Sequence, residues 1–190
     1  MMFHFIGIKG SGMSALAQLL HDLGFVVQGS DVTHHLYTED DLRSKNIPIF
    51  PFDVSNIKKG YTIVVGNAFD DSNIELKRAK ELNLDIIRYP EMMGKVVKKF
   101  DTLSVCGTHG KTTTTAMISY IMDNVLGVNY LIGDGTGHAK KGNLKLIMEA
   151  CEFKRVFLNY FPKDIIVTNI GLEHLDYYKD IEDIKSAFKE

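Results

Sequence analysis

The feature that most constrains this chain is a glycine-rich turn between a strand-like run and a helix-like stretch. The turn, Gly107-Thr108-His109-Gly110-Lys111-Thr112, follows the apolar run at residues 103–106. Successive backbone N–H groups of such a turn point at one anion, and the dipole of the next helix adds positive potential. The Lys111 ammonium adds a full charge, and the Thr112 hydroxyl suits the magnesium of a nucleoside triphosphate. The segment predicts a phosphate-binding loop.

The match to the general P-loop pattern is incomplete. Val105 stands where that pattern has its first glycine. An ordinary glycine-rich turn that carries a surface lysine is the alternative interpretation. The strand, loop and helix context favours phosphate binding.

A second glycine turn follows the strand-like residues Phe3–Ile6 and precedes a helical pattern. Its glycines, at positions 7, 10 and 12, depart from GxGxxG spacing because Lys9 replaces the middle glycine, yet they still allow backbone to approach a diphosphate. Lys9 either points to solvent or neutralises that diphosphate. Asp31 ends the next strand, where an acidic residue commonly holds a ribose. Two such turns predict two nucleotides bound by adjacent domains.

Short β-branched runs alternate with helical patterns along the whole chain, which predicts an α/β fold with parallel sheets. We expect a Rossmann-like unit at residues 1–99 and a P-loop-type α/β unit at 100–190. The expected strands lie near 3–7, 25–28, 47–50, 62–66, 85–89, 102–106, 129–132, 144–149 and 164–169. The expected helices lie near 13–23, 38–45, 72–82, 91–99 and 112–124.

Local signals support several of these boundaries. Ser72 and Glu75 have the spacing of a capping box, Gly24 suits a helix stop, and Pro90 suits a first helical turn. In the helix after the phosphate loop, the apolar positions are expected to face the core. These positions are Met117, Ile118, Tyr120 and Ile121.

Composition excludes several classes of protein. With 45% hydrophobic residues, 24% charged residues and a net charge of -2, the chain lacks the basic field of a nucleic-acid-binding protein. No apolar run is long enough to span a bilayer, and the N-terminus has no signal-peptide pattern. Cys106 and Cys151 are expected to be reduced, and Cys106 to be a small buried hydrophobe. The sequence predicts a cytoplasmic protein without nucleic-acid or membrane partners.

Seven segments together resemble the Mur ligases of cell-wall synthesis, and the resemblance covers the whole chain. They are GIKGSGMSALA at 7–17, QGSD at 28–31, GNA at 66–68, GTHGKTTTT at 107–115, LIGDGTG at 131–137, MEACEFKRVFL at 148–158 and TNIGLEHLDYY at 168–178. Ser11 and Met13 favour the branch of the family that adds L-alanine over the murein peptide ligases.

The resemblance implies ATP-dependent ligation of L-alanine to the lactyl carboxylate of UDP-N-acetylmuramate, through an acyl phosphate and with Mg²⁺. ATP would contact the central loop, namely Gly107, Thr108, His109, Gly110, Lys111, Thr112 and Thr113. UDP-sugar would contact Gly7, Lys9, Gly10, Ser11, Gly12, Met13, Asp31 and Asn67.

The resemblance also implies catalytic roles for Lys111, His109, Glu149 and His174. Thr112 and Glu149 would hold the first magnesium, and His174 the second. Glu152 is the second choice of ligand. Gly171 and Glu173 depart from acidic residues common in relatives, and the longer Glu173 could displace the second metal.

The family pattern implies further central strands and a C-terminal domain beyond residue 190. We therefore expect ligand sites but little or no turnover by this chain alone. Two alternatives are a non-catalytic UDP-sugar-binding module and a murein peptide ligase. A third, a nicotinamide-dependent oxidoreductase, depends on the first glycine turn and Asp31 alone, and GTHGKT argues against it.

Overall fold

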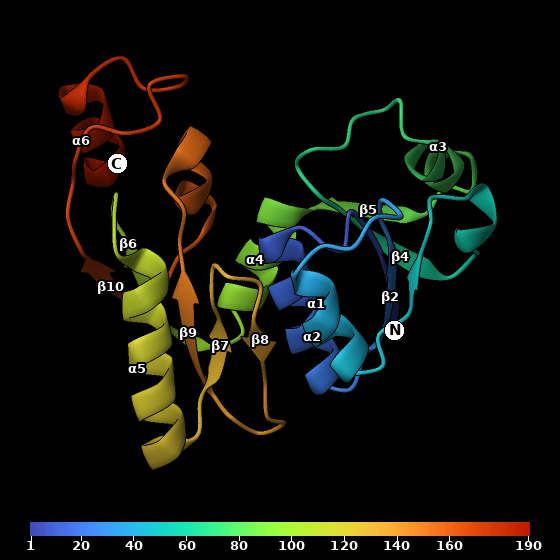
Figure 1. Cartoon of the computed structure of the whole chain (residues 1–190), viewed down its shortest axis with the longest axis horizontal. Helices are drawn as coiled ribbons and strands as arrows, with labels where there is room; N and C mark the ends of the chain where they lie inside the picture. The colour runs from blue at the N-terminus through green and yellow to red at the C-terminus, as the bar shows by residue number, and fades with distance from the viewer.

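Two five-stranded sheets organise the chain (Figure 1), and in each of them a glycine turn follows the first strand in sequence. The computed structural model describes residues 1–190. The first sheet is parallel, in the order β3-β2-β1-β4-β5. Its strands are β1 (Met2–Ile6), β2 (Val26–Ser30), β3 (Ile49–Phe50), β4 (Tyr61–Val65) and β5 (Asp85–Arg88).

The second sheet has the order β10-β6-β9-β7-β8. Its strands are β6 (Asp101–Cys106), β7 (Asn129–Leu131), β8 (Gly137–His138), β9 (Lys145–Glu149) and β10 (Asp164–Val167). All its pairs are parallel except β7 with β8, so the sheet is mixed. Strand β8 was not predicted, because two residues are too short to show an alternating pattern.

Six α-helices and two short 3₁₀ segments connect the strands. The helices are α1 (Ser11–Asp22), α2 (Thr38–Ser44), α3 (Ile74–Glu81), α4 (Tyr89–Val97), α5 (Lys111–Leu126) and α6 (Ile181–Lys189). The 3₁₀ segments are η1 (Val54–Asn56) and η2 (Phe153–Asn159). None of the helices has both the length and the apolarity that crossing a membrane requires.

Cap chemistry sets the helix ends. Gly24 has φ +92° directly after α1, as expected for a helix stop, and Pro90 lies in the first turn of α4. The predicted cap at Ser72 is wrong. Asn73 caps α3 instead, and its side chain accepts hydrogen bonds from the N–H groups of Glu75 and Leu76. The Glu75 side chain is unavailable to a capping box because it is buried beside His4.

The prediction for the face of α5 is wrong for three of its four residues, and Ile118 alone is half-buried. Thr115 and Ser119 are the buried residues of this helix, whereas Met117 is 60%, Tyr120 75% and Ile121 57% exposed. The N-terminus of α5 is fixed by the phosphate loop, and the hydroxyl of Thr115 bonds to the Lys111 carbonyl. This rotation of the helix turns its small polar residues toward the sheet.

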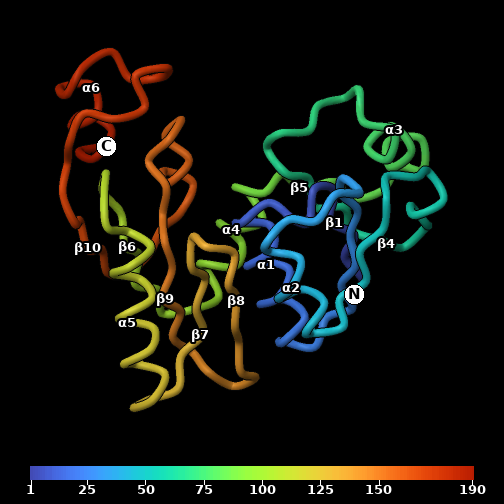
Figure 2. The backbone as a smooth tube through the Cα atoms, viewed as in Figure 1, coloured from blue at the N-terminus to red at the C-terminus, as the bar shows by residue number.

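The two sheets share one apolar core. A single cluster of 25 buried residues includes Phe5 and Leu16 of the first unit and Leu146 and Met148 of the second. Strand β8 runs beside α1, and the two units are in direct contact there (Figure 2). An added Cβ at Gly137 would lie 1.9 Å from the Ala15 carbonyl oxygen, so only glycine allows this approach.

Candidate functional site

The turn after β6 forms a backbone cradle at the carboxyl edge of the second sheet. Gly107 and Gly110 have φ of +124° and +79°, which glycine adopts without the strain that a side chain would add. The Lys111 ammonium folds back over the turn and donates to the carbonyls of Gly107 at 2.7 Å and Thr108 at 3.0 Å. The loop therefore presents its cation and the N-terminus of α5 together, an arrangement suited to phosphate.

The segment after β10 holds this turn in place. The Thr108 N–H donates to the Asn169 carbonyl, and the His109 N–H donates to the Asn169 side chain at 3.1 Å. Thr168 and Asn169 both donate to the His109 carbonyl, at 2.7 and 2.9 Å. These bonds fix the His109 backbone, while its imidazole is 72% exposed. His109 can therefore reach a ligand without disturbing the loop.

Glu149, the last residue of β9, faces the first helical turn of α5. The Thr112 hydroxyl donates to its carboxylate at 2.8 Å, and the Gly133 N–H donates to the same oxygen at 3.1 Å. A hydroxyl and a carboxylate are the oxygen donors that Mg²⁺ prefers. Thr112 and Glu149, predicted from far-apart segments, thus lie together as a pair suited to a hard cation.

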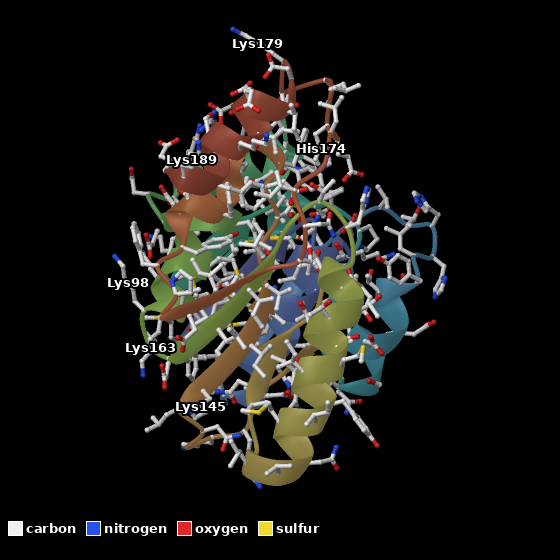
Figure 3. All side chains as sticks on the ribbon, turned by 90° about the vertical axis from the view of Figure 1, so that its left-hand side faces the viewer. Lys98, Lys145, Lys163, His174, Lys179 and Lys189 are labelled. Carbon is white, nitrogen blue, oxygen red and sulfur yellow. The ribbon has the colours of Figure 1, made fainter.

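Glu152 lies at the centre of a second group. Its carboxylate is 3.1 Å from the Lys111 ammonium and 3.6 Å from the His174 imidazole, and the residue is 1% exposed. Ligand atoms of Glu152, Glu173 and His174 all lie within 4.8 Å of one another. This donor set fits a divalent cation, and it is Glu152 that brings His174 to the phosphate loop. Figure 3 shows His174 in the loop beyond the N-terminal end of α5.

The first glycine turn has a different polar arrangement. The Asp31 carboxylate accepts from the N–H groups of Lys9 at 2.7 Å and Val32 at 2.8 Å, and Asp31 is 6% exposed. The Lys9 ammonium forms a 2.5 Å ion pair with Glu39 and also donates to two backbone carbonyls. Both side chains therefore stabilise the turn, and Lys9 points neither to solvent nor into the turn.

A cavity of about 290 Å³ lies between the two units. Ser11, Gly12 and Asn67 line it from the first unit, and Gly133 and Glu149 line it from the second. Of the other residues predicted for the first turn, Gly7 packs against Phe69, Gly10 approaches Met13, and Met13 is buried in the core. The cavity thus brings the N-terminus of α1 and the Glu149 carboxylate to one space.

Two tyrosines and one thiol, that of Cys151, line this cavity. Burial raises the pKa of Tyr89 and of Tyr160, which line the cavity together, so both hydroxyls stay neutral. Burial raises the pKa of the Cys106 thiol to about 11, and burial also raises that of Cys151. Both cysteines are free thiols, and Cys106 is buried as expected. Neither has the thiolate character of a nucleophile.

Three contributors to the site were not singled out from the sequence. They are Asn169, which holds the phosphate loop, Gly133, which orients Glu149, and Gln18, which holds the loop that carries Gly133. Gln18 lies in the interior of an amphipathic helix, where no motif marks it. The signal for Gly133 was its place in a glycine-rich hairpin, whose partner surface only the fold provides.

Comparison with known proteins gives a consistent result for both units. Residues 2–101 match the Mur ligase family, catalytic domain, and residues 105–190 match the Mur ligase middle domain.

Solved structures are similar across nearly the entire chain. The UDP-N-acetylmuramate-alanine ligase of Thermotoga maritima is 32% identical, with a TM-score of 0.85 over 100% of this chain and 46% of that one. The UDP-N-acetylmuramate:L-alanyl-gamma-D-glutamyl-meso-diaminopimelate ligase of Neisseria meningitides is 25% identical, with a TM-score of 0.81. That match covers 98% of this chain and 66% of the neighbour. A murein peptide ligase of Psychrobacter arcticus is 25% identical, with a TM-score of 0.77, and the match covers 99% of this chain and 45% of the neighbour. The chain thus spans between 45% and 66% of the length of these neighbours.

Proposed function

This chain belongs to the Mur ligase family, and we propose that it takes part in the ATP-dependent ligation of L-alanine to the lactyl carboxylate of UDP-N-acetylmuramate. The observation that carries the proposal is the shared cavity. Ser11 and Gly12, beside the first glycine turn, face Gly133 and Glu149, beside the phosphate loop. A sugar nucleotide on one unit and a triphosphate on the other would meet there. The 32% identity to an alanine ligase supports L-alanine as the acceptor.

In the proposed reaction a carboxylate oxygen of the sugar attacks the γ-phosphorus of ATP, and the bond to ADP breaks. The amine of L-alanine then attacks the acyl-phosphate carbon, phosphate leaves with the bonding electrons, and the amine loses a proton. Lys111 and the backbone cradle neutralise the phosphoryl oxygens and orient them. The His109 imidazole is exposed on the loop, and in the proposed reaction it contacts the reacting groups on the substrate side.

Thr112 and Glu149, together with the group formed by Glu152, Glu173 and His174, would hold Mg²⁺. Bound there, Mg²⁺ supplies charge neutralisation to the triphosphate. Lys111 is paired with Glu152 in this structure. We infer that phosphate binding shifts Lys111 from that carboxylate to the anion, so that Glu152 becomes free to ligate a cation.

Calorimetry on the 190-residue chain tests the two ligand sites. We expect UDP-N-acetylmuramate to bind, and we expect Lys111→Ala to abolish binding of Mg-ATP while sparing the sugar nucleotide. Lys141→Ala removes an exposed lysine far from the loop in the sequence and is the matched control. NAD serves as a negative ligand. Absence of UDP-N-acetylmuramate binding by a folded chain would overturn the proposal.

Acceptor choice is tested separately. Trapping with hydroxylamine detects an acyl phosphate formed from UDP-N-acetylmuramate and ATP, and acceptors are then compared in product analysis. L-alanine as the preferred acceptor supports the proposal. A murein tripeptide as the preferred acceptor would favour the second candidate, a murein peptide ligase. The similarity of this chain to two peptide ligases supports that candidate. Sugar-nucleotide binding without ATP binding favours a non-catalytic module.

A further inference from the structure

A second cavity of about 490 Å³ lies at the opposite end of the first sheet from its glycine turn. Phe3 near the start of β1, Leu20 near the end of α1 and Val96 near the end of α4 line it. The first turns of the same two helices line the cavity between the units, through Ser11 and Tyr89. The two cavities therefore lie at opposite ends of one helix pair, and nothing in the proposed ligation uses the second one.

The walls of this cavity suit an apolar body. Phe3 and Phe25 meet edge to face, with ring centroids 5.4 Å apart, and Phe100 adds a third ring. Leu23 and Met92 add to the apolar wall, and Thr62 is the one uncharged polar residue of the lining. Small-molecule sites are typically concave, mostly apolar and a few hundred cubic ångströms in volume, with a few polar groups that fix orientation. The cavity has these properties.

Its rim carries positive charge. Lys95, Lys98 and Lys99 line the opening, against a single carboxylate at Asp85, and none of the four takes part in an ion pair. The Lys98 ammonium is 5.6 Å from the ring centroid of Phe161, on the second unit, and so is directed away. Figure 3 shows Lys98 at the edge of the molecule. Lys95, in the last turn of α4, and Lys99, just after that helix, are left to face a ligand.

We propose that this cavity binds an amphipathic organic anion, with an alkyl or aromatic body between the phenylalanine rings and a carboxylate or sulfonate at Lys95 and Lys99. The lysines also complement the negative end of the α4 dipole. That role accounts for their charge but not for an apolar cavity beside them. Charge and cavity together specify an anion with an apolar tail, and the inference does not depend on the proposed ligation.

The chain has no tryptophan, so a single introduced one can report on this cavity. We would titrate Phe25→Trp with decanoate below its micelle concentration and follow the emission. Decyltrimethylammonium, which has the same tail and the opposite charge, is the control ligand. We expect a saturable change with decanoate only. The double variant Lys95→Gln, Lys99→Gln should weaken decanoate binding about tenfold, the size expected for two partly exposed charge pairs. Lys58→Gln with Lys59→Gln removes two other exposed lysines and should leave the affinity unchanged.

Equal binding of the cation and the anion, or equal affinity in both lysine variants, would overturn the proposal. Because Phe25→Trp alters the wall, the natural sequence is tested as well, by NMR of methyl-labelled methionine. Decanoate should shift the Met92 methyl signal and leave that of Met148, which lies in the second sheet, in place. An unmoved Met92 signal would contradict the site. Capture of the chain by phosphatidylglycerol vesicles without decanoate binding would instead indicate a membrane surface and would also contradict it.

Discussion

The side-chain amide of Gln18 donates a 2.8 Å hydrogen bond to the backbone carbonyl of Gly135, joining α1 of the first unit to the β7–β8 loop of the second. Its oxygen accepts from the Gly137 N–H at 3.3 Å, so both ends of this buried amide contact the same loop. The loop also carries Gly133, which donates to Glu149. A continuous set of contacts thus runs from the helix after the first glycine turn to the candidate metal ligand.

Replacing Gln18 tests this connection. Gln18→Ala removes the side-chain acceptor of the Gly137 N–H and leaves the Gly135 carbonyl with the Ser14 hydroxyl as its remaining side-chain donor. This loss should lower the free energy of unfolding by about 2 kcal/mol. Since the loop also orients Glu149, we expect weaker Mg-ATP binding with little change for metal-free ATP. Thermal unfolding and calorimetry measure the two effects. His21→Ala, in the same helix, is the control, and equal effects of both variants would refute a positioning role for Gln18.

Breaking the Lys9–Glu39 ion pair should destabilise the first glycine turn. Both side chains are almost completely buried, and removal of Lys9 leaves Glu39 with Arg43 as its one remaining cationic partner. We expect Lys9→Ala to lower the free energy of unfolding by about 3 kcal/mol, and Lys9→Met with Glu39→Gln to recover most of it. Denaturant unfolding measures both. If Lys9 instead contacted the diphosphate, Lys9→Ala would weaken UDP-sugar binding with little loss of stability.

Stability should fall in acid through Glu75. Burial alone would raise the pKa of this carboxyl group, but hydrogen bonds from His4, Ser30, Asn56 and the Asp53 N–H outweigh burial and hold the pKa below the ordinary 4.5. A carboxylate with a lowered pKa in the folded state stabilises it above the unfolded-state pKa, and this contribution is lost as pH falls through the folded-state pKa.

Glu75→Gln should therefore lower the free energy of unfolding at pH 7 by about 2 kcal/mol, and the difference from the natural chain should shrink below pH 4.5. Glu81→Gln, at an exposed position of the same helix, is the matched control. Denaturant unfolding at several pH values gives the comparison. A Glu75→Gln difference that stayed constant down to pH 3 would show that the carboxylate charge is not the cause.

Glu152→Gln separates the two roles of the Lys111 pair. The amide keeps the shape but loses the charge that now holds Lys111, so metal-free ATP should bind about fivefold more tightly. The same change removes a cation ligand, so added Mg²⁺ should improve ATP binding less than in the natural chain. Calorimetry with and without Mg²⁺ tests both. Glu182→Gln, on the exposed surface of α6, should alter neither value.

Much of the architecture could be predicted locally. The run of buried apolar residues in β1 is typical of a parallel strand covered on both faces, and the glycine turns after β1 and β6 mark where strand gives way to helix. The apolar face of α5 could not be predicted, because hydrophobic periodicity reports a stripe and not the surface that covers it. Met117 and Tyr120 follow that stripe and are exposed.

The sequence by itself determined the chemistry available to this protein: two glycine turns, the lysine and threonine of the phosphate loop, and carboxylates and a histidine at strand ends. These depend on residue type and short spacing, which the chain carries locally. Tertiary structure alone decided which of them meet. Glu152 pairs with Lys111, 41 residues away, because parallel strands bring their carboxyl ends to one edge of the sheet. Gln18 contacts Gly135, 117 residues away, because glycine lets the two backbones approach closely. Such distant contacts depend on the packing of whole elements, so no local pattern encodes them.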